Sequence, residues 1–541
     1  MIIRIDVLKV LQNLLSNVSL RTPHRIEYIT KTLQSYVTTL SDSNLQVLVD
    51  LDLPNGEVYF RPIESHILHC STCMVRYKTG NSEYMEQPAF IPITTTCCSK
   101  KIRINPRASQ VRIYTENGII DGLNYHGLCK TCKTKFYRHW TENKDGYRTY
   151  LTDGDDYFMI TSSIAFTTRY LERISLQICI GATSFDKISE MYNVEFGIDD
   201  STKKLIAEVI ENHWLIKRLI SICPTMLWHR KDHNKHFDIE KICEDVYPTL
   251  KKVIDQKWFS HECNETGCKN KMVVIDGNEK LYRYCCAKPI TKLPHEIGEV
   301  NKVVRCINNP VRGNQSLKGS KLCHIHSNES GEMKNEIKNE RLDLYPMTRQ
   351  RVKLLENVIT SGEGCKKEEN CNKYETRTAG MLYVFRSCGI RLSHFEMYTA
   401  ESLSMVFTGL IDIFQGNLNG NLKGIVYDRS CDLHPYVCRL AREGNVFAKA
   451  IEELMFIVDV FHAEKHTQSK CVLSSDDCKY HPDLPKFKDV RKMNTEVCEQ
   501  TFHVLNCYKN ITRNMTYAKR LCLLKLLDDN YNTRLSKKLS Y

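Results

Sequence analysis

The chain has 541 residues, which is long enough for two or three domains and at least one sizeable core. Its hydrophobic fraction of 42% and charged fraction of 26% are ordinary for a globular protein and exclude a largely disordered chain. No apolar stretch approaches the ~18 residues that a membrane helix needs. The net charge of +12 favours a polyanionic partner.

The 25 cysteines are the most informative feature of the composition. The N-terminal stretch MIIRIDVLKVLQNLLSNV is interrupted by Asp6, Lys9 and Gln12, so it does not have the pattern of a secretory signal. Without such a signal, the cysteines indicate a reducing compartment and metal binding rather than disulfides.

The first half of the chain predicts three successive segments. Residues 1–60 are expected to be mainly helical, and residues 61–145 to form a β-rich module held by zinc. Helical patterns follow in residues 146–260, where FTTRYLERISLQICIG and SFDKISEMYNVEF have the length and break of a helix-turn-helix. Such a pair either reads DNA or simply packs, and the pattern leaves both interpretations open.

From residue 261 onward, strand and helix patterns alternate. Strand-like KMVVID, KLYRYCC and GMLYVFRSCGIRL precede helix ESLSMVFTGLIDIFQ, strand LKGIVYD, helix PYVCRLAREGNV, strand LMFIVDVFH and a helix from about Asn494. This order predicts an α/β layered domain (α+β for the whole chain) with a mixed sheet over residues 261–530. Residues 285–375 are expected to be a cysteine-rich insertion with a polar linker, and residues 531–541 a frayed tail.

Three groups of cysteines and histidines have zinc-ligand spacing, because short knuckles supply two of the four tetrahedral ligands at once. The first group, which lies close to His126, contains Cys70, Cys73, Cys97, Cys98, Cys129 and Cys132. The second contains Cys263, Cys268, Cys285, Cys286, Cys306, Cys323 and His326. The third, an insertion over residues 462–481, contains His462, His466, Cys471, Cys478 and His481. The ligand pairing stays open, and buried reduced cysteines are the alternative.

Several carboxylates occur in the order that a ribonuclease H-like fold uses: a first strand, a later adjacent strand and a C-terminal helix. Two-metal nucleases and transposases gather such groups around divalent ions. Asp276 ends VVID, Asp428 ends GIVYD, and Glu496 and Glu499 share one helix face. Asp459 in FIVDVFH is an accessory candidate. The alternatives are a hairpin turn at the first Asp-Gly pair and a helix cap at the second aspartate.

Longer stretches resemble one known family. GIVYDRSCDLHP, VDVFHAEKHTQSKC and NTEVCEQTFHVLNCYKNITRNMTYAKR resemble successive motifs of the KDZ (Kyakuja–Dileera–Zisupton) transposases, and VVIDGN resembles the family's first motif. The family usually continues that motif with Phe, where this chain has Glu279. The resemblance covers most of residues 60–525, including the cysteine clusters. The chain is also similar to the C-terminal half of a vertebrate HMG-box protein derived from this family, although residues 1–60 show no HMG box.

The resemblance implies a ribonuclease H-like transposase domain with Asp276, Asp428 and Glu499 as catalytic acids, and with Glu496 as the alternative third acid. It implies Mg2+ or Mn2+ for catalysis, structural Zn2+ at two or more sites, DNA as partner, no membrane association and a nuclear location. A homo-oligomer is an open alternative. Two functions follow: a metal-dependent DNA strand-transferase, or a domesticated, catalytically inactive zinc protein that binds DNA or chromatin.

Overall fold

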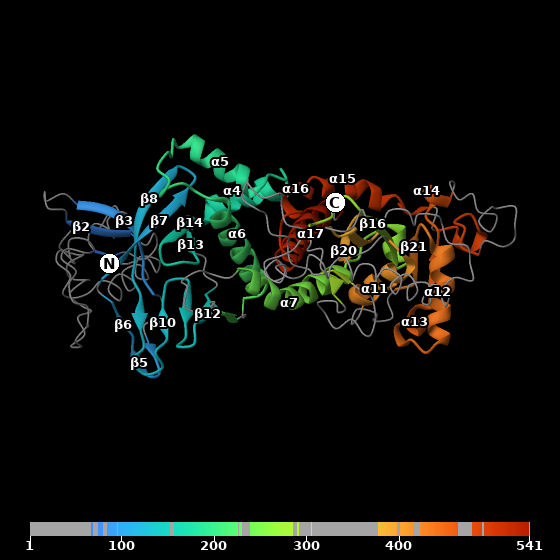
Figure 1. Ribbon diagram of the computed structural model, residues 1–541, viewed down its shortest axis with the longest axis horizontal. Coiled ribbons are helices and arrows are strands. Elements are labelled where there is room, and N and C mark those ends of the chain that lie inside the picture. The colour runs from blue at the N-terminus through green and yellow to red at the C-terminus, as the bar shows by residue number, and fades with distance from the viewer. Residues whose placement is uncertain are drawn as a thin grey trace, which may run out of the picture. The chain divides into compact units, whose positions relative to one another are not determined.

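The structure is a computed structural model that divides into two compact units, Met1–Val246 and Tyr247–Tyr541 (Figure 1). The boundary falls inside helix α7 (Ile239–Phe259). The residues that the structure describes are 67–68, 74–78, 84–151 without 93, 95 and 106, 156–224, 227–229, 239–284, 289–290, 304–305, 377–397, 401–414, 422–463, 479–489 and 492–539.

The first unit is built on two larger sheets and a short hairpin. The seven-stranded sheet has the order β1 (Ile67–Leu68), β2 (Met74–Lys78), β3 (Tyr84–Phe90), β8 (Gly118–Asn124), β7 (Ser109–Thr115), β14 (Ile164–Thr167) and β13 (Tyr157–Met159). The six-stranded sheet has the order β15 (Leu227–His229), β12 (Tyr147–Tyr150), β11 (Trp140–Glu142), β10 (Lys135–Phe136), β9 (Gly127–Leu128) and β6 (Arg103–Ile104). The hairpin joins β4 (Thr96–Cys97) to β5 (Lys100–Lys101).

Helices α4 (Thr168–Cys179), α5 (Phe185–Glu195) and α6 (Ala207–Ile222) also belong to this unit. Thr167 and Ser184 cap the first two, because each side-chain oxygen accepts a hydrogen bond from a first-turn backbone N–H. The helices predicted from FTTRYLERISLQICIG and SFDKISEMYNVEF are therefore confirmed, whereas their DNA-reading role stays a prediction. Strands β12, β13 and β14 occupy the beginning of the segment that was expected to be helical, because β12 alternates buried and more exposed residues with a period of two.

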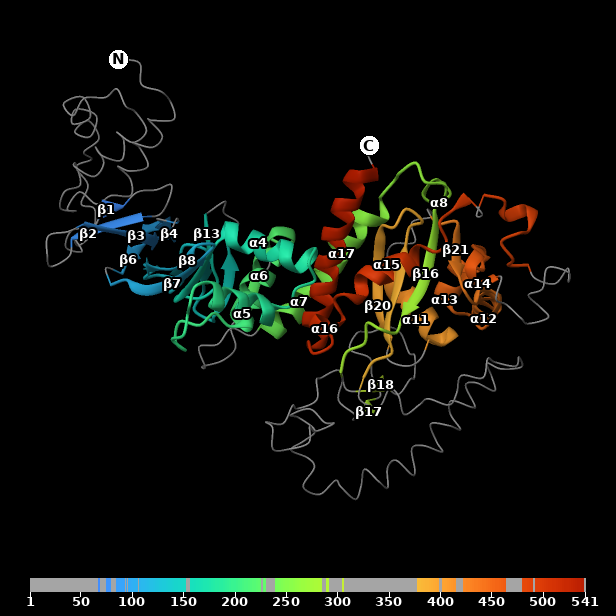
Figure 2. The ribbon, with the colours of Figure 1, turned by 90° about the horizontal axis from the view of Figure 1, so that it is seen from above.

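The second unit contains a five-stranded mixed sheet in the order β20 (Arg391–Met397), β19 (Gly380–Phe385), β16 (Met272–Asn278), β21 (Gly424–Tyr427) and β22 (Met455–Ile457). Strand β16 pairs antiparallel with β19 and parallel with β21, and β21 pairs parallel with β22. Figure 2 shows β16 between β20 and β21. The predicted α/β arrangement with a mixed sheet is confirmed.

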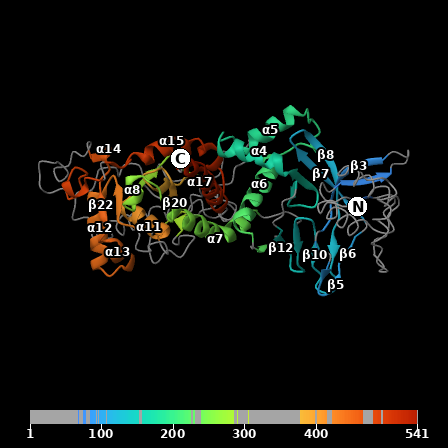
Figure 3. The same ribbon diagram turned by 180° about the vertical axis from the view of Figure 1, so that it is seen from behind.

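Helices cover both faces of this sheet. Helices α11 (Leu403–Phe414), α12 (Ser430–Arg442) and α13 (Val446–Ile451) lie on one side and α15 (Val497–Asn506) on the other (Figures 1 and 3). Neighbouring residues of β19 show the two faces: a Cβ on Gly409 of α11 would lie 2.6 Å from Leu382, whereas the Tyr383 ring lies 6.2 Å from the Phe502 ring of α15. Successive strand residues point to opposite faces, so the sheet is buried on both.

Two sequence predictions are wrong in this unit. The Asp276-Gly277 pair does not form a hairpin turn, because β16 continues to Asn278, paired with β19, and turns afterwards. Residues 531–539 are not a frayed tail, because they belong to helix α17 (Tyr517–Leu539), and residues 540–541 lie outside the described residues. The buried Asn532 side chain fixes this helix by donating to the Arg391 carbonyl at 2.7 Å and accepting from its N–H at 2.9 Å.

Within the described ranges, every helix is too short or too polar to cross a membrane. The strand predicted for KLYRYCC is not formed over its described residues 280–284, where only Tyr284 makes an isolated bridge, with Arg377. The strands β17 (Pro289–Ile290) and β18 (Val304–Arg305) form a separate two-stranded sheet.

Candidate metal-binding sites

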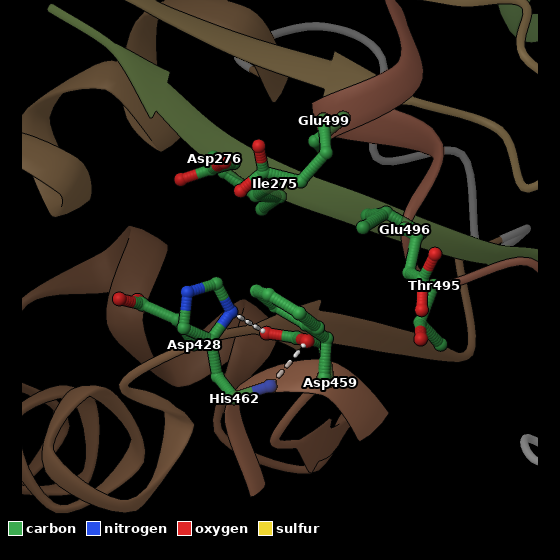
Figure 4. Close-up of a pocket in the computed structure, with 11 residues that line it drawn as sticks. Ile275, Asp276, Asp428, Asp459, His462, Thr495, Glu496 and Glu499 are labelled. Carbon is green, nitrogen blue, oxygen red and sulfur yellow. Dashed lines mark hydrogen bonds and ion pairs between the residues drawn. The ribbon is translucent and has the colours of Figure 1, made fainter. Parts of the chain in front are cut away.

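Acidic side chains gather where the parallel pairing of β16 with β21 ends. The pairing of the two strands stops at Ile275 and Tyr427, so Asp276 and Asp428 follow at the same edge of the sheet. Figure 4 shows the pocket at this edge. Its lining includes Asp276, Asp428, Asp459, His462, Glu496 and Glu499. The predicted acids therefore lie around one pocket, although they are separated by more than 200 residues in the sequence.

Helix α15 brings the two glutamates to this pocket. The Val460 N–H donates to the Thr495 hydroxyl at 3.3 Å and so ties the segment before α15 to the segment after β22. Cys498 and Phe502 are buried and fix the inner face of the helix. Figure 4 shows Glu499 next to Asp276, while Glu496 lies beside Thr495. Glu499 is therefore the better placed of the two alternatives for the third acid.

The electrostatics of this pocket favour a bound cation. Burial, and then the negative charges of Glu401, Asp428 and Glu499, raise the pKa of Asp276 well above its usual range. Burial also raises the pKa of Asp428. The buried Oδ1 of Asp428 has no hydrogen-bond partner among the described residues. Like-charged carboxylates that are partly desolvated are costly unless a cation compensates them, and oxygen ligands suit Mg2+ or Mn2+.

Asp459 and His462 form an ion pair at the rim of the pocket (Figure 4). The Asp459 carboxylate accepts from His462 Nδ1 at 2.7 Å and from the His462 backbone N–H at 2.9 Å, at the start of the short helix α14 (Val460–Ala463). This hydrogen bond raises the pKa of His462 to about 9, and the charges of Asp428 and Asp276 add to the effect. Asp459 therefore orients a cationic imidazole towards the other acids.

The third predicted zinc group is not assembled by the described residues. His462 lies in the acid pocket, and His466, Cys471 and Cys478 lie outside the described residues. His481 is buried, and its Nδ1 accepts a hydrogen bond from the backbone N–H of Asp483 at 3.3 Å. This zinc group stays a prediction.

The first sulfur cluster consists of Cys97, Cys98, Cys129 and Cys132, whose sulfur atoms all lie within 4.8 Å of one another. Cys97 Sγ is 3.5 Å from Cys132 Sγ and 3.8 Å from Cys98 Sγ. Cys98 and Ser99 form the two-residue turn between β4 and β5, with φ of 51° and 61°. Four sulfur atoms at this spacing are consistent with tetrahedral zinc. Cys70 and Cys73, which were predicted with them, lie outside the described residues.

The second cluster consists of His261, Cys263, Cys268 and Cys388, again with ligand atoms within 4.8 Å of one another. Three follow one another after α7, with Cys268 on the short helix α8 (Thr266–Lys269), and Cys388 lies in the turn between β19 and β20. Cys388 Sγ is 3.6 Å from His261 Nε2. The hydrogen bond with Cys388 contributes most to lowering the pKa of Cys268 to about 6, which favours the thiolate form that zinc binds.

Sequence reasoning missed two of these four ligands. His261 stands two residues before Cys263, a His-x-Cys spacing that marks a ligand pair, whereas Cys388 is isolated in the sequence and reaches the site only through the β19–β20 hairpin. Several predicted members of the second group lie outside the described residues: Cys285, Cys286, Cys306, Cys323 and His326.

Comparison with known proteins gives two family matches. Residues 270–532 match the Kyakuja-Dileera-Zisupton transposase family, and this range includes all the acids of the pocket. Residues 87–196 match the CxC5 like cysteine cluster associated with KDZ transposases, and this range includes the first sulfur cluster. No curated protein and no solved structure matches the chain.

Proposed function

Because the chain belongs to the KDZ transposase family, we propose that it is a metal-dependent DNA transposase with Asp276, Asp428 and Glu499 as its catalytic acids. The observation that carries this proposal is the meeting of these three side chains at one pocket. We also propose that the sheet is ribonuclease H-like. Its order β20-β19-β16-β21-β22, with an antiparallel second strand and two parallel strands beyond the first, supports that fold.

The three carboxylates would hold divalent ions such as Mg2+ or Mn2+. When bound, such ions activate water or a DNA 3′-hydroxyl for in-line attack on a phosphodiester and stabilise the leaving oxygen. The strand ends hold Asp276 and Asp428 in place, and α15 adds Glu499 from one face. When it is not bound to zinc, the imidazolium of His462, oriented by Asp459, places a positive charge beside the site, where it favours binding of a phosphate.

The first sulfur cluster is a candidate surface for the DNA backbone. Residues 96–107 and 126–139 contain no acidic residue. They present the exposed cations Lys100, Lys101, Arg103, Arg107, Lys130, Lys133 and Lys135. Cations on a small zinc-held scaffold bind phosphates with an affinity that falls as salt rises. A nuclear location is part of the same proposal, because DNA is the substrate.

The test is nicking of a supercoiled plasmid that carries the ends of the element encoding this chain. Asp428→Asn should lower the Mg2+-dependent nicking rate by ~10^3 or more, because an uncharged amide is a poor ligand for a divalent ion. Asp489→Asn is the matched control, because Asp489 is an exposed aspartate of the same unit. DNA binding by the wild type without any Mg2+- or Mn2+-dependent nicking would overturn the proposal in favour of a domesticated DNA-binding protein.

A further inference from the structure

A carboxylate that the sequence analysis did not single out lies beside the acid pocket. Glu401 comes four residues after β20 and two before α11. It lies against Gly277, whose partner Leu382 packs against Gly409 of α11, so Glu401 is on the sheet face opposite α15. Strand β21 stops at Tyr427, so β16 has no strand partner on that side beyond Ile275. The opening that this leaves lies next to Asp276 and Asp428, because these two residues directly follow the last paired residues of β16 and β21.

Two contacts hold the Glu401 side chain at this opening. The Tyr427 hydroxyl donates to Glu401 Oε1 at 3.0 Å. The other oxygen lies against Gly277, where a Cβ would collide with it and would be 2.8 Å from Glu401 Cδ. Gly277 therefore leaves room for the carboxylate immediately next to Asp276. A glycine inside a strand often marks such a close approach.

The two cationic side chains that act on these acids, His462 and Arg429, are each hydrogen-bonded to another carboxylate. Among the negative groups, Glu401 contributes most to raising the pKa of Asp276, and Asp428 contributes most to raising the pKa of Glu401. Arg429 lies in the same region, but its guanidinium donates two hydrogen bonds to Asp432, at 3.0 and 3.2 Å. The buried Oδ1 of Asp428 is left without a hydrogen-bond partner. Crowded carboxylates of this kind are the ligand set of a hard divalent ion.

We propose that Glu401 is a further metal-coordinating carboxylate of this site, supplied from the face opposite Glu499 and oriented by Tyr427. The proposal rests on the proposed function, because it concerns the same divalent ions. With Glu401 included, the site has four carboxylates that come from two strand ends, the segment before α11 and helix α15. A metal held by ligands from both faces of the sheet would link those two layers.

The test measures Mn2+ binding to the full chain with its zinc left in place, by the electron paramagnetic resonance signal of free Mn2+. Glu401→Gln keeps an acceptor for Tyr427 but removes the charge, and it should raise the Kd for Mn2+ by about tenfold or more. In buffer without Mn2+ or Mg2+, and with the zinc still in place, the same variant should unfold at an equal or higher temperature, because like-charge repulsion with Asp276 and Asp428 is relieved. A residue that only supports the fold would instead lower that temperature.

Three further variants complete the experiment. Tyr427→Phe should weaken Mn2+ binding less than Glu401→Gln does, because it removes only the orienting hydrogen bond. Gly277→Ala should weaken Mn2+ binding by displacing the Glu401 carboxylate, so the proposal stays testable if Glu401→Gln does not fold. Glu443→Gln is the control, since Glu443 is an exposed glutamate following α12, and should leave Mn2+ binding unchanged.

The outcomes separate this inference from the proposed function. Wild-type protein that neither binds Mn2+ nor nicks DNA would overturn both. Wild-type protein that binds Mn2+ and nicks DNA, together with a folded Glu401→Gln or Gly277→Ala variant of unchanged Mn2+ affinity, would overturn only the role of Glu401.

Discussion

The acid pocket and the cluster of His261, Cys263, Cys268 and Cys388 lie in the same unit but are assembled differently. The pocket takes its three proposed catalytic acids from three different elements: Asp276 from β16, Asp428 from the end of β21 and Glu499 from the first turn of α15. The cluster takes three of its four ligands from one short segment and only the fourth from a distant hairpin. The pocket offers hard oxygen atoms at a sheet edge, whereas the cluster offers four soft or borderline ligand groups of the kind that suit zinc.

This difference separates the expected roles of the two metals. A closed tetrahedral site contributes directly to folding, because its ligands meet only in the folded chain. A pocket of carboxylates that repel one another destabilises the fold until a cation binds, and the open position is what catalysis requires. The variants below should therefore affect activity when they alter the pocket and stability when they alter the sulfur clusters.

The largest effect is expected from the third acid. Glu499→Gln should lower Mg2+-dependent nicking by ~10^3, because Glu499 lies next to Asp276, whereas Glu496→Gln should lower it by less than about tenfold. Neither change should reduce the free energy of unfolding by more than about 0.5 kcal/mol. The measurement is the single-turnover nicking rate of both variants at saturating Mg2+. A greater loss in Glu496→Gln would assign the third acid to Glu496 instead.

The next largest effect is expected at Cys388. Cys388→Ser should remove one zinc ion per chain and lower the stability of the second unit by about 3 kcal/mol, because the β19–β20 hairpin loses its link to the segment after α7. Zinc content and urea unfolding measure the two quantities. Cys438→Ser is the control, since Cys438 is a half-buried cysteine of the same unit outside the cluster. Unchanged zinc content in Cys388→Ser would show that Cys388 is not a ligand.

The sequence predicted the local parts of these sites and missed the parts that depend on packing. Asp276, Asp428 and Glu499 could be predicted as a set, because each lies next to or within a strand or helix whose hydrophobic pattern is clear in the sequence. Cys388 could not be assigned, because no neighbouring ligand marks it and only the hairpin brings it to His261. The alternative of a hairpin turn at Asp276-Gly277 could not be excluded from the sequence, because residue propensity does not show that pairing with β19 keeps this part of β16 extended.

The first sulfur cluster should respond less than the second. Cys98 is exposed and lies in a two-residue turn, so Cys98→Ser should lower the stability of the first unit by about 1–2 kcal/mol, with a weaker zinc site rather than its complete loss. Competition with a chromogenic zinc chelator measures the affinity. Cys507→Ser, another exposed cysteine, should change neither zinc affinity nor stability. A stability loss as large as that of Cys388→Ser would remove the contrast between the two clusters.

The smallest effect is expected from the backbone of the two turns. In the second cluster the positive φ of 94° falls on Gly389, directly after the ligand Cys388, whereas in the first cluster Cys98 and Ser99 themselves adopt φ of 51° and 61°. A non-glycine residue with a positive φ of this size costs about 1–2 kcal/mol, and Cys98 has to remain a cysteine to bind zinc.

Ser99→Gly should therefore stabilise the first unit by about 0.5 kcal/mol, because glycine relieves the strain but loses more chain entropy on folding. Gly389→Ala should do the opposite and destabilise the second unit by about 1 kcal/mol, since a Cβ there would also lie 3.1 Å from Leu535. Urea unfolding of the zinc-loaded chain measures both changes. If both variants were stabilised, or both destabilised, the two turns would not differ in backbone strain.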